Sequence, residues 1–105
     1  MRINQWEVWL ARVRFEDSPE VKPRPVVVVG GGEVFVCAYK VTSHPPRPVW
    51  GEYVLKQWQA IGLRRESTVR LSKRIRLESR DMIHRIGTLD PIDILSIQNI
   101  LMRTC

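Results

Sequence analysis

The chain has 105 residues, of which 17 are Lys or Arg and 11 are Asp or Glu, so its formal net charge is +6. This length predicts one domain over residues 1–105 and excludes large cofactor folds such as a TIM barrel, which needs about 250 residues. The hydrophobic fraction of 44% and the charged fraction of 27% are typical of a folded globular protein and not of a disordered one.

The basic excess is larger in the second part of the chain. Residues 1–60 carry eight basic and six acidic side chains, whereas residues 61–105 carry nine and five. Such an excess favours polyanions, nucleic acid above all, as partners. An ordinary solvated surface explains the net charge equally well.

The cysteines and histidines give no sign of a metal site or a disulfide framework. Cys37, Cys105, His44 and His84 show none of the usual ligand spacings, so we expect no metal and no other cofactor. No apolar stretch approaches the roughly 20 residues that cross a membrane, and the N-terminus lacks a signal peptide. A cytoplasmic protein without membrane contact is expected.

The first part of the chain alternates between strand and loop patterns. Apolar positions alternate from Trp6 onward with one slip near Ala11, which predicts a strand with a bulge. Two prolines predict a loop at 16–24, and three glycines at 30–32 predict a turn. The predicted strands are 6–15, 26–29 and 33–39.

The middle of the chain continues in the same manner. A second proline-rich loop is predicted at 43–51, and a helical turn at 57–61 that Gly62 closes. Ser79 resembles the N-cap of a short helix that ends at Gly87. The predicted strands are 52–55 and 67–77.

The clearest local signal lies near the C-terminus. Asp90 can cap a helix, Pro91 fits the first helical position, and Asp93 favours the positive end of the helix dipole. The helix is predicted to run to about Met102 and is apolar on most of its circumference, so we expect burial on more than one side. It is either a core helix or one that partly covers a partner subunit.

These elements predict a mainly β fold. About five strands with short connections precede the C-terminal helix, and no βαβ alternation appears. A small curled antiparallel sheet with a helix packed on it is therefore expected.

Arg24 is the first candidate for chemistry. It lies between two prolines where the loop enters a buried strand, next to Lys22, and prolines restrict the backbone on both sides. A guanidinium held in this way suits phosphate binding. The competing interpretation is an ion pair with a carboxylate of its own loop, from Glu16, Asp17 or Glu20.

A second group of polar side chains follows the third strand. Thr42 and Ser43 offer hydroxyls, His44 can act as acid or base near neutral pH, and Arg47 adds a cation. Strand ends that open into loops often carry functional side chains. The alternative is a Ser/Thr turn that satisfies backbone groups, with His44 exposed.

The strand at 67–77 carries a row of basic side chains. Because side chains alternate across a strand, four polar residues are predicted on one face, with Lys73 on the other, mainly apolar face. The four are Arg70, Ser72, Arg74 and Arg76. Such a face can follow a phosphate backbone, or it can protect an edge strand by its charge.

The four tryptophans divide into two groups. Trp6, Trp9 and Trp58 are expected in or around the core. Trp50 lies in the proline-rich loop, where it can stack on a base or cover the core.

Taken in order, these segments resemble the PemK/MazF family of toxins from type II toxin–antitoxin systems, over nearly the whole chain. The family patterns are G-x-(I/V)-(W/Y), R-P-(V/A)-(L/V)-V, (V/I)-T-S, G-L-x-x-x-S-x-V and I-G-x-L. The corresponding segments are Trp6-Glu7-Val8-Trp9-Leu10, Arg24-Pro25-Val26-Val27-Val28, Val41-Thr42-Ser43, Gly62-Leu63 with Ser67-Thr68-Val69-Arg70, and Ile86-Gly87-Thr88-Leu89.

The resemblance implies an SH3-like barrel with a C-terminal helix, working as a homodimer. It implies a metal-independent endoribonuclease that cuts single-stranded RNA at short sequences and leaves a 2′,3′-cyclic phosphate and a 5′-OH. It also implies a cognate acidic antitoxin, a segment of which folds as it binds, and DNA binding by the toxin–antitoxin complex.

Carried over by motif, Arg24 stabilises the phosphorane or protonates the leaving oxygen, and Thr42 holds the 2′-OH with Ser43 close by. Arg70 matches a further active-site arginine of some members. The RNA-binding side chains are then Lys22, Arg47, Trp50, Arg70, Ser72, Arg74 and Arg76.

The chain departs from the family pattern in its acids. The loop before Arg24 lacks the G-x-E of many members, for which Glu20 is the nearest substitute, and Ser72 stands where some members have Asp. The family's R-T-I-D corresponds only approximately to residues 75–78. His44 is therefore a hypothetical base.

Two other functions use the same fold. A gyrase inhibitor relies on a C-terminal Trp-Gly-Ile, whereas this chain ends Leu101-Met102-Arg103-Thr104-Cys105. A non-catalytic RNA-binding module is the remaining alternative.

Overall fold

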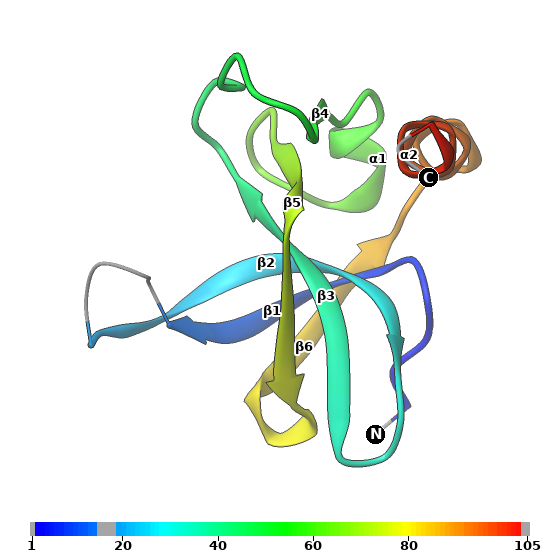
Figure 1. The fold of residues 1–105 in the computed structure, drawn as a ribbon. Helices are drawn as coiled ribbons and strands as arrows, with labels where there is room; N and C mark the ends of the chain where they lie inside the picture. The colour runs from blue at the N-terminus through cyan, green and yellow to red at the C-terminus, as the bar shows by residue number, and fades with distance from the viewer. Residues whose placement is uncertain (1, 15–18, 104–105) are drawn as a thin grey trace.

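A computed structural model describes residues 2–14 and 19–103. Six antiparallel strands form one sheet in the order β4-β5-β3-β2-β1-β6, and helix α2 lies beside its upper part (Figure 1). The strands are β1 (Glu7–Arg14), β2 (Val21–Gly31), β3 (Phe35–Thr42), β4 (Glu52–Val54), β5 (Thr68–Glu78) and β6 (Met82–Thr88). The helices are α1 (Trp58–Ile61), the 3-10 turn η1 (Ser79–Asp81) and α2 (Pro91–Met102).

The mainly β class with a C-terminal helix is confirmed, with six strands instead of about five. The sheet does not close into a barrel, because β4 and β6 are edges that do not pair with each other. Helix α1 packs against β6 instead. A Cβ added at Gly62 would lie 3.2 Å from the carbonyl oxygen of Ile86, and one at Gly87 would overlap the carbonyl oxygen of Ile61.

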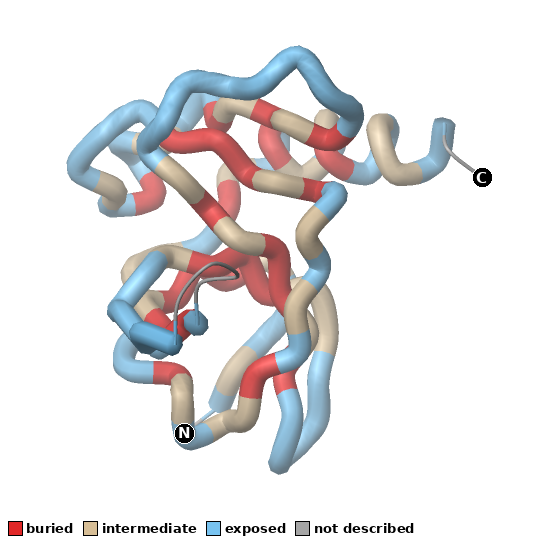
Figure 2. The backbone as a smooth tube through the Cα atoms, turned by 60° about the vertical axis from the view of Figure 1, so that its left-hand side comes forward, coloured by how far each residue is buried: buried red, intermediate tan, exposed pale blue. Residues whose placement is uncertain are grey.

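The core consists of two clusters of buried side chains. One cluster lies between the sheet and the two α-helices and includes Tyr53, Leu55 and Ile97. The other takes its residues from β1, β2, β3, β5 and β6 and includes Trp9, Val26 and Met82. Figure 2 shows buried segments in both parts of the molecule, with exposed loops around them.

The short helix predicted at 79–87 is wrong. Only Ser79–Asp81 forms a single 3-10 turn, and residues 82–88 form β6, which pairs with β1. The turn is stabilised by reciprocal hydrogen bonds between Glu78 and Asp81. Met82, which lies opposite Ala11, is buried in the second core cluster, so tertiary burial overrides the local helix signal.

The loop predicted at 16–24 is also too long, because β2 begins at Val21. Residues 21–25 pair with β1 alone, since pairing with β3 starts at Val26. Pro23 and Pro25 are tolerated because an edge strand leaves the N–H side unpaired. Phe15 and residues 16–18, including Glu16 and Asp17, lie outside the described residues.

The bulge predicted in the first strand lies on β6 instead, because Ile83 and Ile86 are the extra residues, and β1 pairs with β2 without any shift. The pairing of β1 with β6 shifts register between Leu10 and Ala11, and also between Val8 and Trp9. Trp9 is buried, and Trp6 and Trp58 pack against the core as expected.

The C-terminal helix begins as predicted, with the Asp90 carboxylate accepting from the N–H of Ile92 at 3.0 Å. Burial on more than one side is wrong for this chain alone. Only Asp93 and Ile97 are buried, whereas Leu95 is 60% and Met102 is 73% exposed. Among the described residues, no helix has the length and apolarity needed to span a membrane.

The buried side chain of Glu7 connects β1 to the segment before it and to β6. Its carboxylate accepts hydrogen bonds from the backbone of Asn4 at 2.7 Å, the indole of Trp9 at 3.0 Å and the guanidinium of Arg85 at 3.1 Å. Burial by itself raises the pKa of Glu7, but these hydrogen bonds outweigh it and hold the pKa below the ordinary value of 4.5.

We predict that Gly87→Ala destabilises the protein by about 1–3 kcal/mol, because α1 must move away from β6. Urea unfolding of the purified protein measures this change. Gly30→Ala is the matched control, since a Cβ there meets nothing within 4 Å. Equal midpoints for the two variants would contradict the close contact between α1 and β6.

We predict that Glu7→Gln costs about 2 kcal/mol at pH 7, because three donors lose a charged acceptor. A carboxyl whose folded pKa is depressed stabilises the fold above its unfolded pKa and loses this contribution as the pH falls through the folded value. The difference between wild type and variant should therefore shrink below pH 4.5. Urea unfolding from pH 7 to pH 3 tests this, with exposed Glu33→Gln as control.

Candidate nucleic-acid interface

A cleft opens where β2 and β3 separate. Their ladder ends at the pair Val26–Lys40, and the next residue of β2 is Pro25, which has no N–H to donate. Beyond that point, β2 pairs only with β1, and Thr42 of β3 pairs with Thr68 of β5. Figure 1 shows the two strands diverging here. The proline that follows Arg24 thus ends the pairing that would otherwise close this space.

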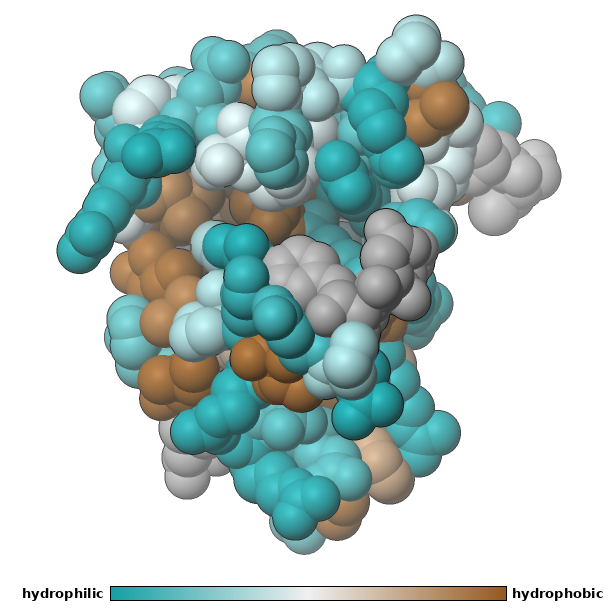
Figure 3. All heavy atoms as spheres, turned by 90° about the vertical axis from the view of Figure 1, so that its left-hand side faces the viewer, coloured by the Kyte–Doolittle hydropathy of each residue, from teal (hydrophilic) through white to brown (hydrophobic). Residues whose placement is uncertain are grey.

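The cleft has a volume of about 1040 Å³ and a strongly basic lining. No carboxylate occurs among the described residues that line it. Hydrophilic side chains predominate over the upper part of the face in Figure 3. The cationic side chains of the lining are Arg24, Lys40, Arg47, Arg64, Arg65, Arg70 and Lys73, and two histidines, His44 and His84, accompany them.

All four residues predicted as catalytic line this cleft. Arg24 comes from β2, Thr42 from the end of β3, and Ser43 and His44 from the loop that follows. The Oγ1 of Thr42 accepts from the N–H of His44 at 3.2 Å, so the Ser/Thr turn that we considered as an alternative is present. The Thr42 hydroxyl can still donate its proton to a ligand.

Arg47 and Arg70 share one carboxylate, that of Glu52 on β4. The Nε of Arg47 lies 3.2 Å from Glu52 Oε1, and the Nε of Arg70 lies 3.7 Å from the same oxygen. The backbone N–H of Arg47 also donates to it at 3.2 Å. Sequence reasoning missed Glu52, because its place opposite Arg70 depends on the register of β4 with β5.

The single basic face predicted for β5 is wrong. Arg70 pairs with Lys40, but the next pair is Arg74 with Tyr39, so residues 71–73 bulge out of the ladder. Successive residues of β3 lie on opposite faces. Arg70 therefore shares the cleft with Lys40, whereas Arg74 lies on the other face with Tyr39.

The bulge also moves Lys73, which lines the cleft and not the apolar face as predicted. Arg76 lies with its guanidinium 3.7 Å from the ring centre of Phe35, a cation–π contact. Among the described strands, β4 covers β5 only at residues 68–70. Arg74 and Arg76 thus lie on an open stretch of strand, as the edge-protection alternative suggested.

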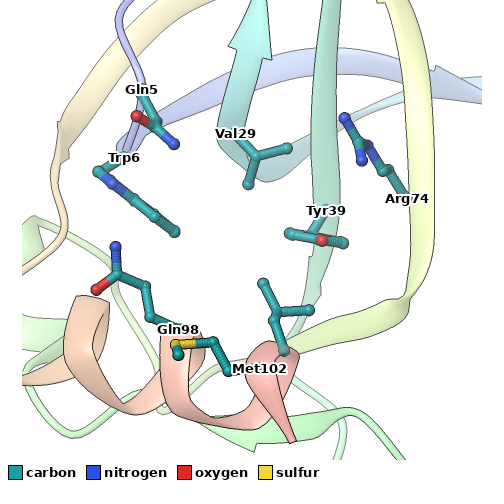
Figure 4. Close-up of a pocket in the computed structure, with 8 residues that line it drawn as sticks. Gln5, Trp6, Val29, Tyr39, Arg74, Gln98 and Met102 are labelled. Carbon is teal, nitrogen blue, oxygen red and sulfur yellow. The ribbon is translucent and has the colours of Figure 1, made fainter. Parts of the chain in front are cut away.

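A second hollow of about 470 Å³ lies on the opposite face of β3 (Figure 4). Trp6, Val29 and Tyr39 border it from the sheet side, and Gln98 and Met102 border it from α2. Arg74 is the only predicted RNA-binding residue among the described residues that line it.

Four predicted RNA-binding residues lie outside both hollows, and one of them is Arg76 with its contact to Phe35. Lys22 is exposed on β2 and pairs with Glu20 at 3.3 Å. Trp50 is 46% exposed in the 43–51 loop, and Ser72 is exposed in the β5 bulge.

Five basic side chains of the cleft, four cations and one histidine, were missed by sequence reasoning. The adjacent arginines that follow Gly62-Leu63 were a visible signal, whereas the others depend on strand register. The five are Lys40, Arg64, Arg65, Lys73 and His84.

Within residues 2–14 and 19–103, no group of three or more His, Cys, Asp or Glu is placed to hold a metal ion. A family model described as PemK-like, MazF-like toxin of type II toxin-antitoxin system matches residues 4–104. No individual curated protein matches the chain.

Proposed function

The chain belongs to the PemK-like, MazF-like toxins of type II toxin–antitoxin systems, and on this premise we propose that it is an endoribonuclease that cuts single-stranded RNA in the basic cleft without a metal. One observation carries the proposal. Arg24 and Thr42 reach the same cleft from two strands that separate, among seven cationic side chains. Such a cleft attracts a phosphodiester chain and can hold one phosphate between the two strands.

The proposed reaction needs no external nucleophile. The ribose 2′-oxygen forms a bond to the adjacent phosphorus while the bond from phosphorus to the 5′-oxygen breaks. A base takes the 2′-OH proton, and an acid gives a proton to the leaving 5′-oxygen. The products are a 2′,3′-cyclic phosphate and a 5′-OH.

Arg24 is proposed to stabilise the negative charge that develops on the phosphoryl oxygens, or to protonate the leaving oxygen. Thr42 orients the 2′-OH, and its own position is fixed by the N–H of His44. Ser43 lies beside it in the cleft. His44 is proposed as the base, since the lining offers no carboxylate among its described residues.

Binding of the RNA backbone is proposed for the remaining cations of the cleft, including Arg47 and Arg70. Trp50 is exposed and can stack on a base beyond the cleft. Lys22, Ser72, Arg74 and Arg76 lie outside the cleft, so contact with them requires a longer RNA path.

A type II toxin implies a cognate antitoxin. We propose that an acidic antitoxin segment folds over the basic cleft, and that the complex binds DNA. We also propose a homodimer in the cytoplasm. Exposed apolar side chains on α2 favour a partner subunit there, and these are Ile92, Leu95 and Met102.

A non-catalytic RNA-binding module is the second candidate, and one observation favours it. The described lining has many cations but no carboxylate, which suits binding more directly than proton transfer. Tight binding of an RNA pool without any cyclic-phosphate product would support this alternative.

We predict that Arg24→Ala lowers kcat for RNA cleavage by about 10²–10³-fold, because the phosphorane loses its main charge partner. A diverse RNA pool incubated with EDTA at low salt, with products analysed for cyclic phosphate, measures this. The same substitution should relieve the growth arrest caused by expression. Arg14→Ala, an exposed arginine on β1 outside the cleft lining, is the matched control. An intact RNA pool with wild-type protein would refute the nuclease.

We predict that His44→Ala slows cleavage and changes the shape of the pH–rate profile, because a general base is lost. His84→Ala is the informative comparison, since His84 lines the same cleft from β6, with its Nδ1 lying 3.3 Å from the Arg85 carbonyl oxygen. An unchanged profile for His44→Ala would remove His44 from the mechanism, and loss of titration only in His84→Ala would assign the base to β6.

A further inference from the structure

Glu52 is a buried carboxylate behind the cleft that the proposed chemistry does not use. Its side chain is 1% exposed, and it is absent from the cleft lining. Its Oε1 faces Arg47 and Arg70, which both line the cleft. Glu52 therefore does not contact the cleft itself and acts on it through Arg47 and Arg70.

The cluster contains two buried polar atoms that are not satisfied. Glu52 Oε2 and Arg70 Nε have no hydrogen-bond partner among the described residues. An unpaired buried donor or acceptor is costly and is rare in a folded protein. Oε1, the oxygen that both guanidinium groups face, is the atom through which the carboxylate holds the two arginines.

We propose that Glu52 is a positioning residue that fixes Arg47 and Arg70 in the cleft and offsets part of their charge, an inference that rests on the proposed nuclease. The carboxylate draws Arg47 through both its backbone N–H and its Nε, so it also anchors the 43–51 loop. Glu52 also lies opposite Arg70 in the β4–β5 ladder, and its carboxylate restricts the position of the Arg70 guanidinium.

In this role Glu52 has opposite effects on RNA affinity and on the rate of cleavage. A carboxylate between two arginines weakens the attraction of both for phosphate, because it competes as an anion. It strengthens catalysis, because oriented charges stabilise a transition state better than mobile ones. Removing the charge of Glu52 should therefore tighten RNA binding while it slows cleavage, an opposite pair of effects that general destabilisation does not produce.

The test is Glu52→Gln, which keeps the shape and one acceptor but removes the charge. We expect the slope of log Kd for single-stranded RNA against log salt to steepen by about 0.7 for each arginine released to a phosphate. We expect kcat to fall by about 10–100-fold. Glu33→Gln is the matched control, because it adds the same net charge at an exposed site outside the cleft lining.

A salt slope and kcat equal to those of Glu33→Gln would overturn the proposal. Glu52→Asp gives a second measurement if Glu52→Gln does not fold, since it keeps the charge but shortens the reach. It should lower kcat with an unchanged salt slope, and an unchanged kcat would also count against positioning. Cleavage by the wild-type protein is measured in parallel, so that failure of the nuclease itself is recognised separately.

Discussion

The buried carboxylate of Asp93 joins helix α2 to β4 and to the segment that follows β4. It is fully buried and accepts from the phenol of Tyr53 at 2.6 Å and from the N–H groups of Lys56 and Gln57 at 2.9 and 3.1 Å. A buried charge is tolerated only when its oxygens are satisfied, so α2 can dock in only one position. Burial and the hydrogen bond to Asp93 raise the pKa of Tyr53 to about 12, so the phenol stays a donor well above neutral pH.

Strand β4 connects the contact between Asp93 and Tyr53 to the cleft. That strand has only three residues and pairs only with the first residues of β5. Tyr53 is its central residue, and its neighbour Glu52 faces Arg47 and Arg70. The helix thus determines where the short strand lies, and the strand determines where two of the cleft's cations point. Core packing and proposed chemistry are here connected by two adjacent residues.

The sequence predicts best where structure depends on neighbouring residues. Asp90 and Pro91 specify a helix start by local hydrogen bonding and geometry, and Gly62 ends α1 with a φ of 112°. The helix predicted at 79–87 fails because pairing with β1, far away in sequence, decides that segment. The face of β5 on which Lys73 lies depends on a bulge in that strand, and the alternation of residue types does not reveal this bulge. Candidate residues could be named from motifs, but their sharing of a cleft depended on register.

The prolines that flank Arg24 have a consequence for self-association. Exposed strand edges are templates on which a second chain can add a strand, and long ones promote aggregation. The unpaired side of β2 at residues 21–25 is such an edge, but Pro23 and Pro25 remove the N–H groups that an incoming strand would need. The surface proposed to bind a polyanion is in this way kept from being covered by another copy's backbone. A ligand reaching this edge has to be recognised by side chains instead of by strand addition.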